Sequence, residues 1–218
     1  MGAYKETVKL FKQLSQVASE LGYSKENILI LENKESELKR LFPNVWNNIF
    51  SCSHHRDKRT PFEYAQDLVA SWFMEDYFLK RLKESGVEID LNGADKERKI
   101  LPNLKVSTNS DYIISFKGKT RIVEFMVDYT GYWTRSNKID LRDNKYLKLS
   151  SNESLFIGLS TLDKKFILLD FKTEINAIFI PSHYPYGGKP AYTIKILDGN
   201  LLNFDVNDLV SKIYLTFE

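Results

Sequence analysis

Two carboxylates on neighbouring predicted strands, Asp111 and Glu124, are the residues best suited to chemistry. Glu124 is the only charge within the otherwise apolar stretch 122–127, and Asp111 opens the partner strand. The short connection Lys117–Thr120 makes these strands a hairpin that can bring the two carboxylates together. Carboxylates that approach each other repel, and a divalent cation between them removes that penalty. Since Mg²⁺ needs only one or two carboxylates besides waters and phosphate oxygens, we expect a Mg²⁺ site at Asp111 and Glu124.

A further acidic position lies on a long predicted helix. Glu75 completes the 4-3-4-3 spacing of an apolar stripe that otherwise consists of Leu68, Trp72, Leu79 and Leu82. A carboxylate on a buried stripe is unfavourable unless another group pairs with it. Either Glu75 contributes to a site, or the stripe rotates slightly and Glu75 lies at its solvent edge, as the polar neighbour Asp76 would allow.

The segment 129–148 has a composition that suits a polyanion. It holds five basic residues against two acidic ones. If 138–149 is a helix, Lys138, Arg142 and Lys145 recur on one face, where they could hold phosphates. Tyr129, Tyr132 and Trp133 precede them, and aromatic rings can stack on or wedge between bases. The alternative is a solvated helix beside a structural aromatic loop. For the aromatic, glycine-rich loop 182–190, a DNA contact and a plain surface loop are equally open.

The elements that must position these residues can be predicted from apolar periodicity and capping signals. Helices are expected at 4–21, from 24, in parts of 36–50, and from Thr60 to about Glu84, where Gly86 ends the last one. The charged stretch 51–60 is expected to be a loop. Expected strands are 87–91, 111–116, 121–127, 155–159, 166–171, 177–180 and 192–197, with helices at 138–149 and 207–213. This order predicts a mixed α/β (α+β) fold, a central mixed sheet flanked by helices.

Composition limits the function classes. The chain has 218 residues, 43% of them hydrophobic, which is enough for a substantial core. Its 31 basic and 29 acidic residues leave a net charge of +2, too balanced for a protein that coats polyanions. Apolar stretches are far shorter than the roughly 20 residues of a membrane helix. The first residues do not form a secretory signal, and a single cysteine, Cys52, suits a reducing cytoplasm. We therefore expect a cytoplasmic protein without a membrane partner.

The order of these acids resembles a known family. Glu75 or Asp76 on a helix, a glycine-bounded turn, a strand, then Asp111 and Glu124 on a hairpin resembles the PD-(D/E)xK nuclease core, in particular small type II restriction endonucleases. The segments that carry the resemblance lie between about residues 62 and 172: Asn92–Arg98, Ser110-Asp111, Val123-Glu124, Asp128–Trp133 and Leu141–Tyr146.

The resemblance implies a restriction-endonuclease-like core over 62–218, preceded by a helical region over 1–50, as one continuous domain. It implies a sequence-specific, Mg²⁺-dependent double-stranded DNA endonuclease that acts as a homodimer, with the N-terminal helices as the expected dimer surface. Asp111 and Glu124 would bind the metal, and Glu75 would add an outer ligand or orient a water. The expected DNA contacts are Lys96, Arg98, Tyr129, Trp133, Arg135, Lys138 and Arg142.

One departure from the family pattern opens alternatives. The family motif would place a lysine at position 126, where this chain has Met126. Lys145, on the following predicted helix, is the nearest replacement, and Lys96, Lys119 and Lys138 are others. Alternatively, catalysis proceeds without a lysine, or the protein is a non-catalytic DNA-binding protein on the same fold. A structure-specific nuclease of repair or recombination is a further possibility.

Overall fold

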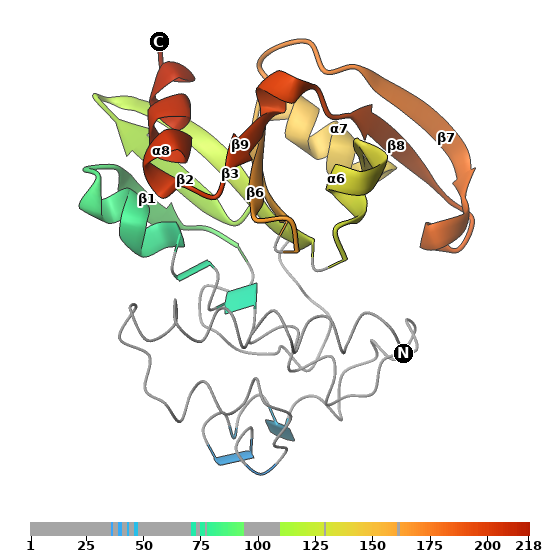
Figure 1. Cartoon of the computed structure of the whole chain (residues 1–218), viewed down its shortest axis with the longest axis horizontal. Coiled ribbons are helices and arrows are strands. Elements are labelled where there is room, and N and C mark those ends of the chain that lie inside the picture. Colours follow the sequence, from blue (N-terminus) through green and yellow to red (C-terminus); the bar gives the residue numbers. More distant parts are fainter. Residues whose placement is uncertain are drawn as a thin grey trace. The chain divides into compact units, whose positions relative to one another are not determined.

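The computed structural model describes residues 36, 39–40, 43, 46–47, 71–72, 75–76, 78–93, 110–128, 130–160 and 162–218 (Figure 1). The chain divides into two compact units, one formed by residues 1–81 and 92–109, the other by residues 82–91 and 110–218. The expected helices at 4–21 and after 24, and the expected loop at 51–60, lie outside the described residues. The described positions among 36–47 and 71–84 are helical. None of the described helices has the length and hydropathy needed to cross a membrane.

The second unit begins with the end of the helix that closes at residue 84, followed by a strand meander. Gly86, with a φ of 84°, follows the last helical turn as the sequence predicts. Strand β1 (Glu88–Leu91) pairs antiparallel with β2 (Tyr112–Phe116), which pairs with β3 (Lys119–Asp128). Lys117 and Gly118 both have positive φ, 50° and 75°, which is the geometry of a two-residue type I′ turn. The predicted hairpin is therefore present, with a turn two residues long.

Six strands form the main sheet, sheet A, in the order β1-β2-β3-β5-β6-β9. Strand β5 (Leu155–Ser160) runs parallel to β3 and is fully buried, and β6 (Lys165–Asp170) and β9 (Leu201–Asn203) follow in antiparallel order. The chain passes from β3 to the parallel strand β5 through two short elements and then helix α7 (Asp143–Ser151), which directly precedes β5. The mixed α+β fold class is thus as predicted, and α7 is placed next to the strand that carries Glu124.

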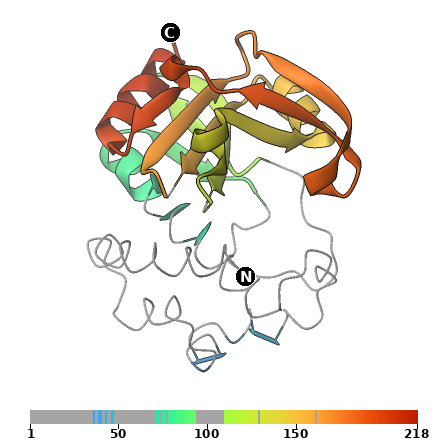
Figure 2. The ribbon, with the colours of Figure 1, turned by 45° about the vertical axis from the view of Figure 1, so that its right-hand side comes forward.

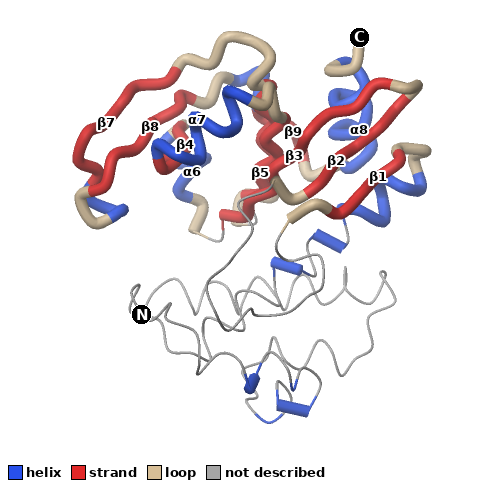
Figure 3. Tube along the Cα trace, turned by 180° about the vertical axis from the view of Figure 1, so that it is seen from behind, coloured by secondary structure: helices blue, strands red, loops and turns tan. Residues whose placement is uncertain are grey.

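A smaller sheet, sheet B, has the order β4-β8-β7 and is entirely antiparallel. It consists of β4 (Lys138–Arg142), β7 (Ala177–His183) and β8 (Lys189–Lys195), and the 3-10 turn η4 (Tyr184–Tyr186) joins the last two. Figure 2 shows β7 running along the side of β8 at the rim of the unit. Viewed from behind in Figure 3, α7 lies between β5 of sheet A and β8 of sheet B, and α6 (Tyr132–Ser136) lies beside β4.

The core of this unit fills the space that sheets A and B share with the two helices. Buried side chains from both sheets form one cluster, which is made up of Trp133, Ile139, Leu141, Leu149, Phe156, Ile167, Leu169, Phe171, Ile194 and Ile196. Tyr146 of α7 stacks on Tyr192 of β8 at a centroid separation of 3.9 Å. Because apolar burial is the main favourable contribution to folding, this cluster fixes α7 between the sheets.

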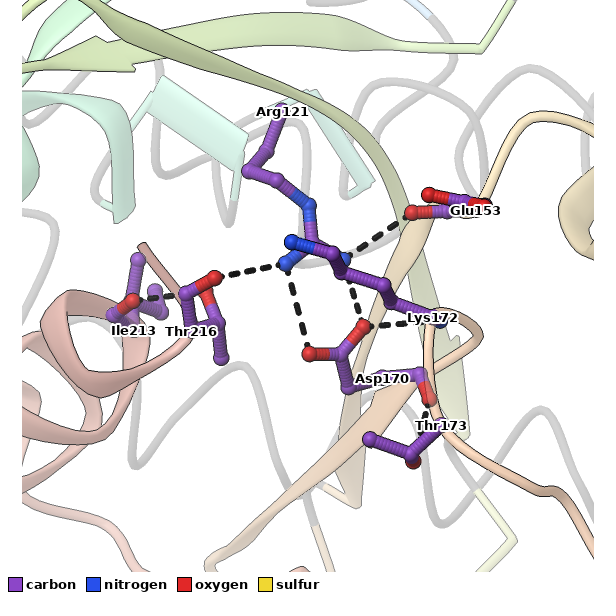
Figure 4. Close-up of polar contacts among 7 residues, drawn as sticks. All are labelled: Arg121, Glu153, Asp170, Lys172, Thr173, Ile213 and Thr216. Atoms are coloured by element: carbon purple, nitrogen blue, oxygen red, sulfur yellow. Dashed lines mark hydrogen bonds and ion pairs between the residues drawn. The ribbon is translucent and has the colours of Figure 1, made fainter. Parts of the chain in front are cut away.

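The opposite face of sheet A is covered by helix α8 (Val206–Leu215). Arg121 of β3, which is 8% exposed, holds that side together (Figure 4). Its guanidinium donates to both carboxylate oxygens of Asp170 at 3.3 and 2.5 Å, and to the carbonyl oxygens of Glu153 (2.9 Å) and Thr216 (2.8 Å). One side chain thus joins β3, the α7–β5 turn, the end of β6 and the end of α8, and the bidentate pair fixes its direction.

The expected helix over 138–149 is wrong in its first part. Residues 138–142 form strand β4, and the helix begins only at Asp143. Ile139 and Leu141 alternate with polar residues and are buried, 0% and 1% exposed, which is strand periodicity. A spacing of four residues is compatible with both periods, so Lys138 and Arg142 share a face in either case. They do not share a helical face with Lys145, which lies on α7. The short elements α6 and β9 were not expected from the sequence.

Candidate functional site

Asp111 and Glu124 lie beside each other at the end of the β2–β3 ladder. The register pairs Tyr112 with Val123, and Asp111 directly precedes this pair. The Oδ2 atom of Asp111 accepts a hydrogen bond of 2.8 Å from the backbone N–H of Phe125, the residue that follows Glu124. This bond fixes the Asp111 carboxylate against strand β3. The hairpin therefore brings Asp111 against the strand that carries Glu124, as the sequence predicts.

Glu124 is buried, with 5% of its surface exposed, and it is paired with Lys145. The Nζ atom of Lys145 donates to Oε1 of Glu124 from the first half of α7. Among the described residues, Lys145 is the only side chain that pairs with Glu124. The crossover helix between two parallel strands makes this contact possible, because it returns the chain across the strand that carries the acid. Lys145, 21 positions after Glu124, thus pairs with its carboxylate. The uncharged Met126, only two positions after Glu124, cannot do so.

The face of β3 that carries Glu124 continues with Met126 and Asp128. Met126 packs against the hydrophobic cluster. Asp128, which is 6% exposed, accepts hydrogen bonds from Thr130 N and Oγ1 through one oxygen and from Trp133 N through the other. These bonds hold the start of α6, so Asp128 serves the local structure. Within the described part of the chain, no group of three or more His, Cys, Asp or Glu is arranged to hold a metal.

Four predicted site residues fall outside the described part of the second unit. Glu75 is buried, with 8% of its surface exposed, so it is not at a solvent edge, and it belongs to the first unit. Lys96, Arg98 and Tyr129 are outside the described residues.

The remaining predicted DNA contacts lie on α6 and β4. Arg135 and Arg142 are exposed, whereas Trp133 is 7% exposed and meets Phe156 edge to face in the core. The ammonium of Lys138 lies 5.5 Å from the ring centre of Tyr132, and the guanidinium of Arg142 lies 5.4 Å from that of Tyr186. Both cations of β4 are therefore stacked on aromatic rings.

A second buried carboxylate, Asp140, was missed by the sequence reasoning. It lies on β4, is 9% exposed, and accepts hydrogen bonds from Thr193 Oγ1 (2.6 Å) and Tyr132 OH (2.8 Å). His183 Nε2 lies 3.2 Å from its Oδ2 atom, and Tyr186 OH donates to its backbone oxygen at 2.5 Å. The available signal was the lone acid within Lys138-Ile139-Asp140-Leu141-Arg142, which the helical interpretation placed on a solvated face.

This cluster sets the ionisation of its members. Burial alone would raise the pKa of Asp140, but the hydrogen bonds from Thr193 and Tyr132 and the charges of Lys138 and His183 bring the pKa below its ordinary value. Burial, followed by the charge of Asp140, raises the pKa of Tyr186. Asp140 is therefore held as an anion and Tyr186 as a neutral phenol.

No protein-family model matches this chain, and a comparison with curated proteins finds no similar sequence.

Proposed function

We propose that this protein is a Mg²⁺-dependent endonuclease that cuts double-stranded DNA at a specific sequence, as type II restriction enzymes do. One observation carries the proposal. Lys145 of α7 reaches the buried carboxylate of Glu124, beside an Asp111 carboxylate anchored on the same strand. Two carboxylates and a lysine are the residues that the nuclease resemblance requires, and here the lysine comes from the helix that follows the hairpin.

The residues present fit a bound Mg²⁺. Asp111 and Glu124 would hold the ion, since Mg²⁺ retains several waters and needs only one or two carboxylates together with substrate phosphate oxygens. When bound, the ion would polarise the scissile phosphate and lower the pKa of the attacking water. Asp111 is already oriented by the N–H of Phe125, and burial shields Glu124 from bulk water. Both ligands are therefore preorganised by the fold.

Lys145 has the role of a cation at the reacting centre. Its side chain is 36% exposed, so the ammonium reaches from the rim to the buried Glu124. In the proposed reaction, it stabilises the negative charge that develops on the phosphorane. Met126 fills core space at the position where the related nucleases carry their lysine.

The proposed enzyme acts as a homodimer in the cytoplasm. One site per chain can cut both strands of a duplex when two copies are related by a two-fold axis, which calls for a palindromic target. A cytoplasmic localisation agrees with a DNA substrate and with a single cysteine.

The test is digestion of long DNA of mixed sequence by the purified protein, with Mg²⁺ or with a chelator. Discrete fragments that appear only with Mg²⁺ are the expected result, and a band pattern that changes with the substrate sequence identifies a specific target. Continuous smearing, or cutting confined to branched or flapped DNA, would instead support a nuclease of repair or recombination. Complete absence of cutting by a protein that binds the DNA would favour the non-catalytic alternative, which Met126 suggests.

A further inference from the structure

A hollow of about 240 Å³ opens on sheet B, and it contains none of the residues assigned to cleavage. Its lining consists of Tyr132, Trp133, Asp140, His183, Pro185 and Tyr186. Pockets for drug-sized ligands measure about 300–1,000 Å³, so this one suits a single flat ring system. Three aromatic rings and a proline form most of its wall, and aromatic walls favour a flat ring that can stack.

The polar group of the hollow accepts hydrogen bonds. A carboxylate has about four acceptor positions. The hydroxyls of Thr193 and Tyr132 occupy two of those of Asp140, and the ring nitrogen Nε2 of His183, 3.2 Å from Oδ2, lies against a third. The remaining position can take one more N–H. His183, of which 8% is exposed, also has a buried Nδ1 atom without a hydrogen-bond partner in the described structure. A ring that presents an amino group would be matched. Thymine would be disfavoured, because its single ring N–H lies between two carbonyl oxygens that a carboxylate repels.

Cations surround the hollow on the same face of sheet B. The register pairs Lys138 with Lys195 and Arg142 with Ala191, and Lys189 with His183. Directly opposed residues share a face of a sheet, and so do alternate residues along a strand. Lys138, Arg142, Lys189 and Lys195 therefore lie on the face that carries Asp140. Such a row suits a phosphate backbone that passes the hollow.

We infer that this face of sheet B binds an unpaired stretch of nucleic acid and takes one base with an exocyclic amine, which adenine, cytosine and guanine have and thymine lacks, into the hollow. The base stacks against the ring of Tyr186 and donates its amino hydrogen to Asp140, while the four cations hold the flanking phosphates. The inference rests on the proposed function, because a nuclease is the protein for which a nucleic acid is the expected ligand.

The probe is a set of fluorescein-labelled heptadeoxynucleotides, six thymines around a central adenine, cytosine or thymine, titrated by anisotropy. The titrations use the Asp111→Asn variant in the presence of a chelator, so that the probes are not cleaved. We expect the adenine and cytosine probes to bind about tenfold more tightly than the thymine probe, in line with the contribution of one stacked base. Equal affinity for the three probes would overturn the inference.

The turn η4 offers a matched pair of variants. Tyr186 lines the hollow, whereas Tyr184, two residues earlier, is 93% exposed and does not. Tyr186→Ala should abolish the base preference, and Tyr184→Ala should keep it; loss in both variants alike would overturn the assignment. If Tyr186→Ala does not fold, Asp140→Asn tests the same point, because an amide donor should bring the thymine probe level with the others.

Failure of this inference and failure of the proposed function are separable. A base preference in a protein that never cuts DNA would support the hollow and refute the endonuclease. Mg²⁺-dependent cutting by a protein without any base preference would refute the hollow alone.

Discussion

Glu124 and Asp140 are both buried carboxylates on strands of the same unit, yet their surroundings differ. Asp140 of sheet B is held by the hydroxyls of Thr193 and Tyr132 and by His183. Glu124 of sheet A is held by one partly exposed side chain, Lys145, from a neighbouring helix. The two hydroxyl donors fix the Asp140 carboxylate in place, whereas a single ammonium can be exchanged for another cation. From this comparison we propose metal binding for Glu124 and a fixed acceptor role for Asp140.

The largest effect should come from substitution of Glu124 or of its neighbour Asp111. Glu124→Gln and Asp111→Asn should each reduce Mg²⁺-dependent cleavage below detection, while DNA binding stays equal or becomes tighter because repulsion of phosphate is removed. Glu88→Gln, which removes an exposed carboxylate from β1 of the same sheet, is the control and should cut normally. Full activity in either site variant would refute the metal site.

A smaller loss is expected at the cation. Lys145→Ala should lower turnover by about 10², with binding nearly unchanged, as expected when stabilisation of the transition state is lost. Lys148→Ala removes a lysine from the next turn of α7 and should have little effect. A parallel loss of binding and turnover in Lys145→Ala would make Lys145 a phosphate contact and leave the catalytic cation unassigned.

The cations of sheet B should affect binding without affecting the chemical step. Arg142→Ala should weaken DNA binding and flatten the dependence of log affinity on log salt by about one unit, because one phosphate contact is lost. Affinity measured over a salt series gives this slope. Lys172→Ala removes an exposed lysine beyond the end of β6 and should leave the slope unchanged; an unchanged slope in Arg142→Ala as well would remove sheet B from the DNA contact.

The smallest effect is the contribution of Asp140 to acid stability. A carboxyl group whose pKa is lowered by folding stabilises the folded state above its unfolded value, near 3.8, and loses this contribution as the pH falls through the lower folded value. Asp140→Asn should therefore lower the free energy of unfolding at pH 6 by about 1–3 kcal/mol, measured by denaturant titration. The difference from the original protein should shrink below pH 3.8. Asp198→Asn, at an exposed position, controls for the loss of one charge. A difference that stays constant from pH 6 to pH 2.5 would contradict the assignment.

The sequence was most informative where the chemistry is local. Two-residue alternation and turn residues located the β2–β3 hairpin, and with it the meeting of Asp111 and Glu124. The approach of Lys145 to Glu124 was also within reach, since a crossover helix must pass over the strand that it leaves. The Asp140 cluster was not, because its partners come from α6, β7 and β8, and only tertiary pairing brings Tyr132, His183 and Thr193 together. In the segment 138–142, a four-residue spacing of cations suits strand and helix alike, and burial of Ile139 and Leu141 decided for the strand.

The open edge of sheet B has a consequence for handling the protein at high concentration. Among the described strands, β7 pairs only with β8, so its outward backbone groups have no strand partner in this part of the chain. Two of its apolar side chains, Ile178 and Phe179, are 63% and 50% exposed. Pro181 has no N–H to offer, and the irregular register between Ile180 and His183 interrupts the edge directly around it. Pro181→Val would lengthen the apolar strand edge that can pair with another chain. We therefore expect this variant to aggregate more readily at high protein concentration.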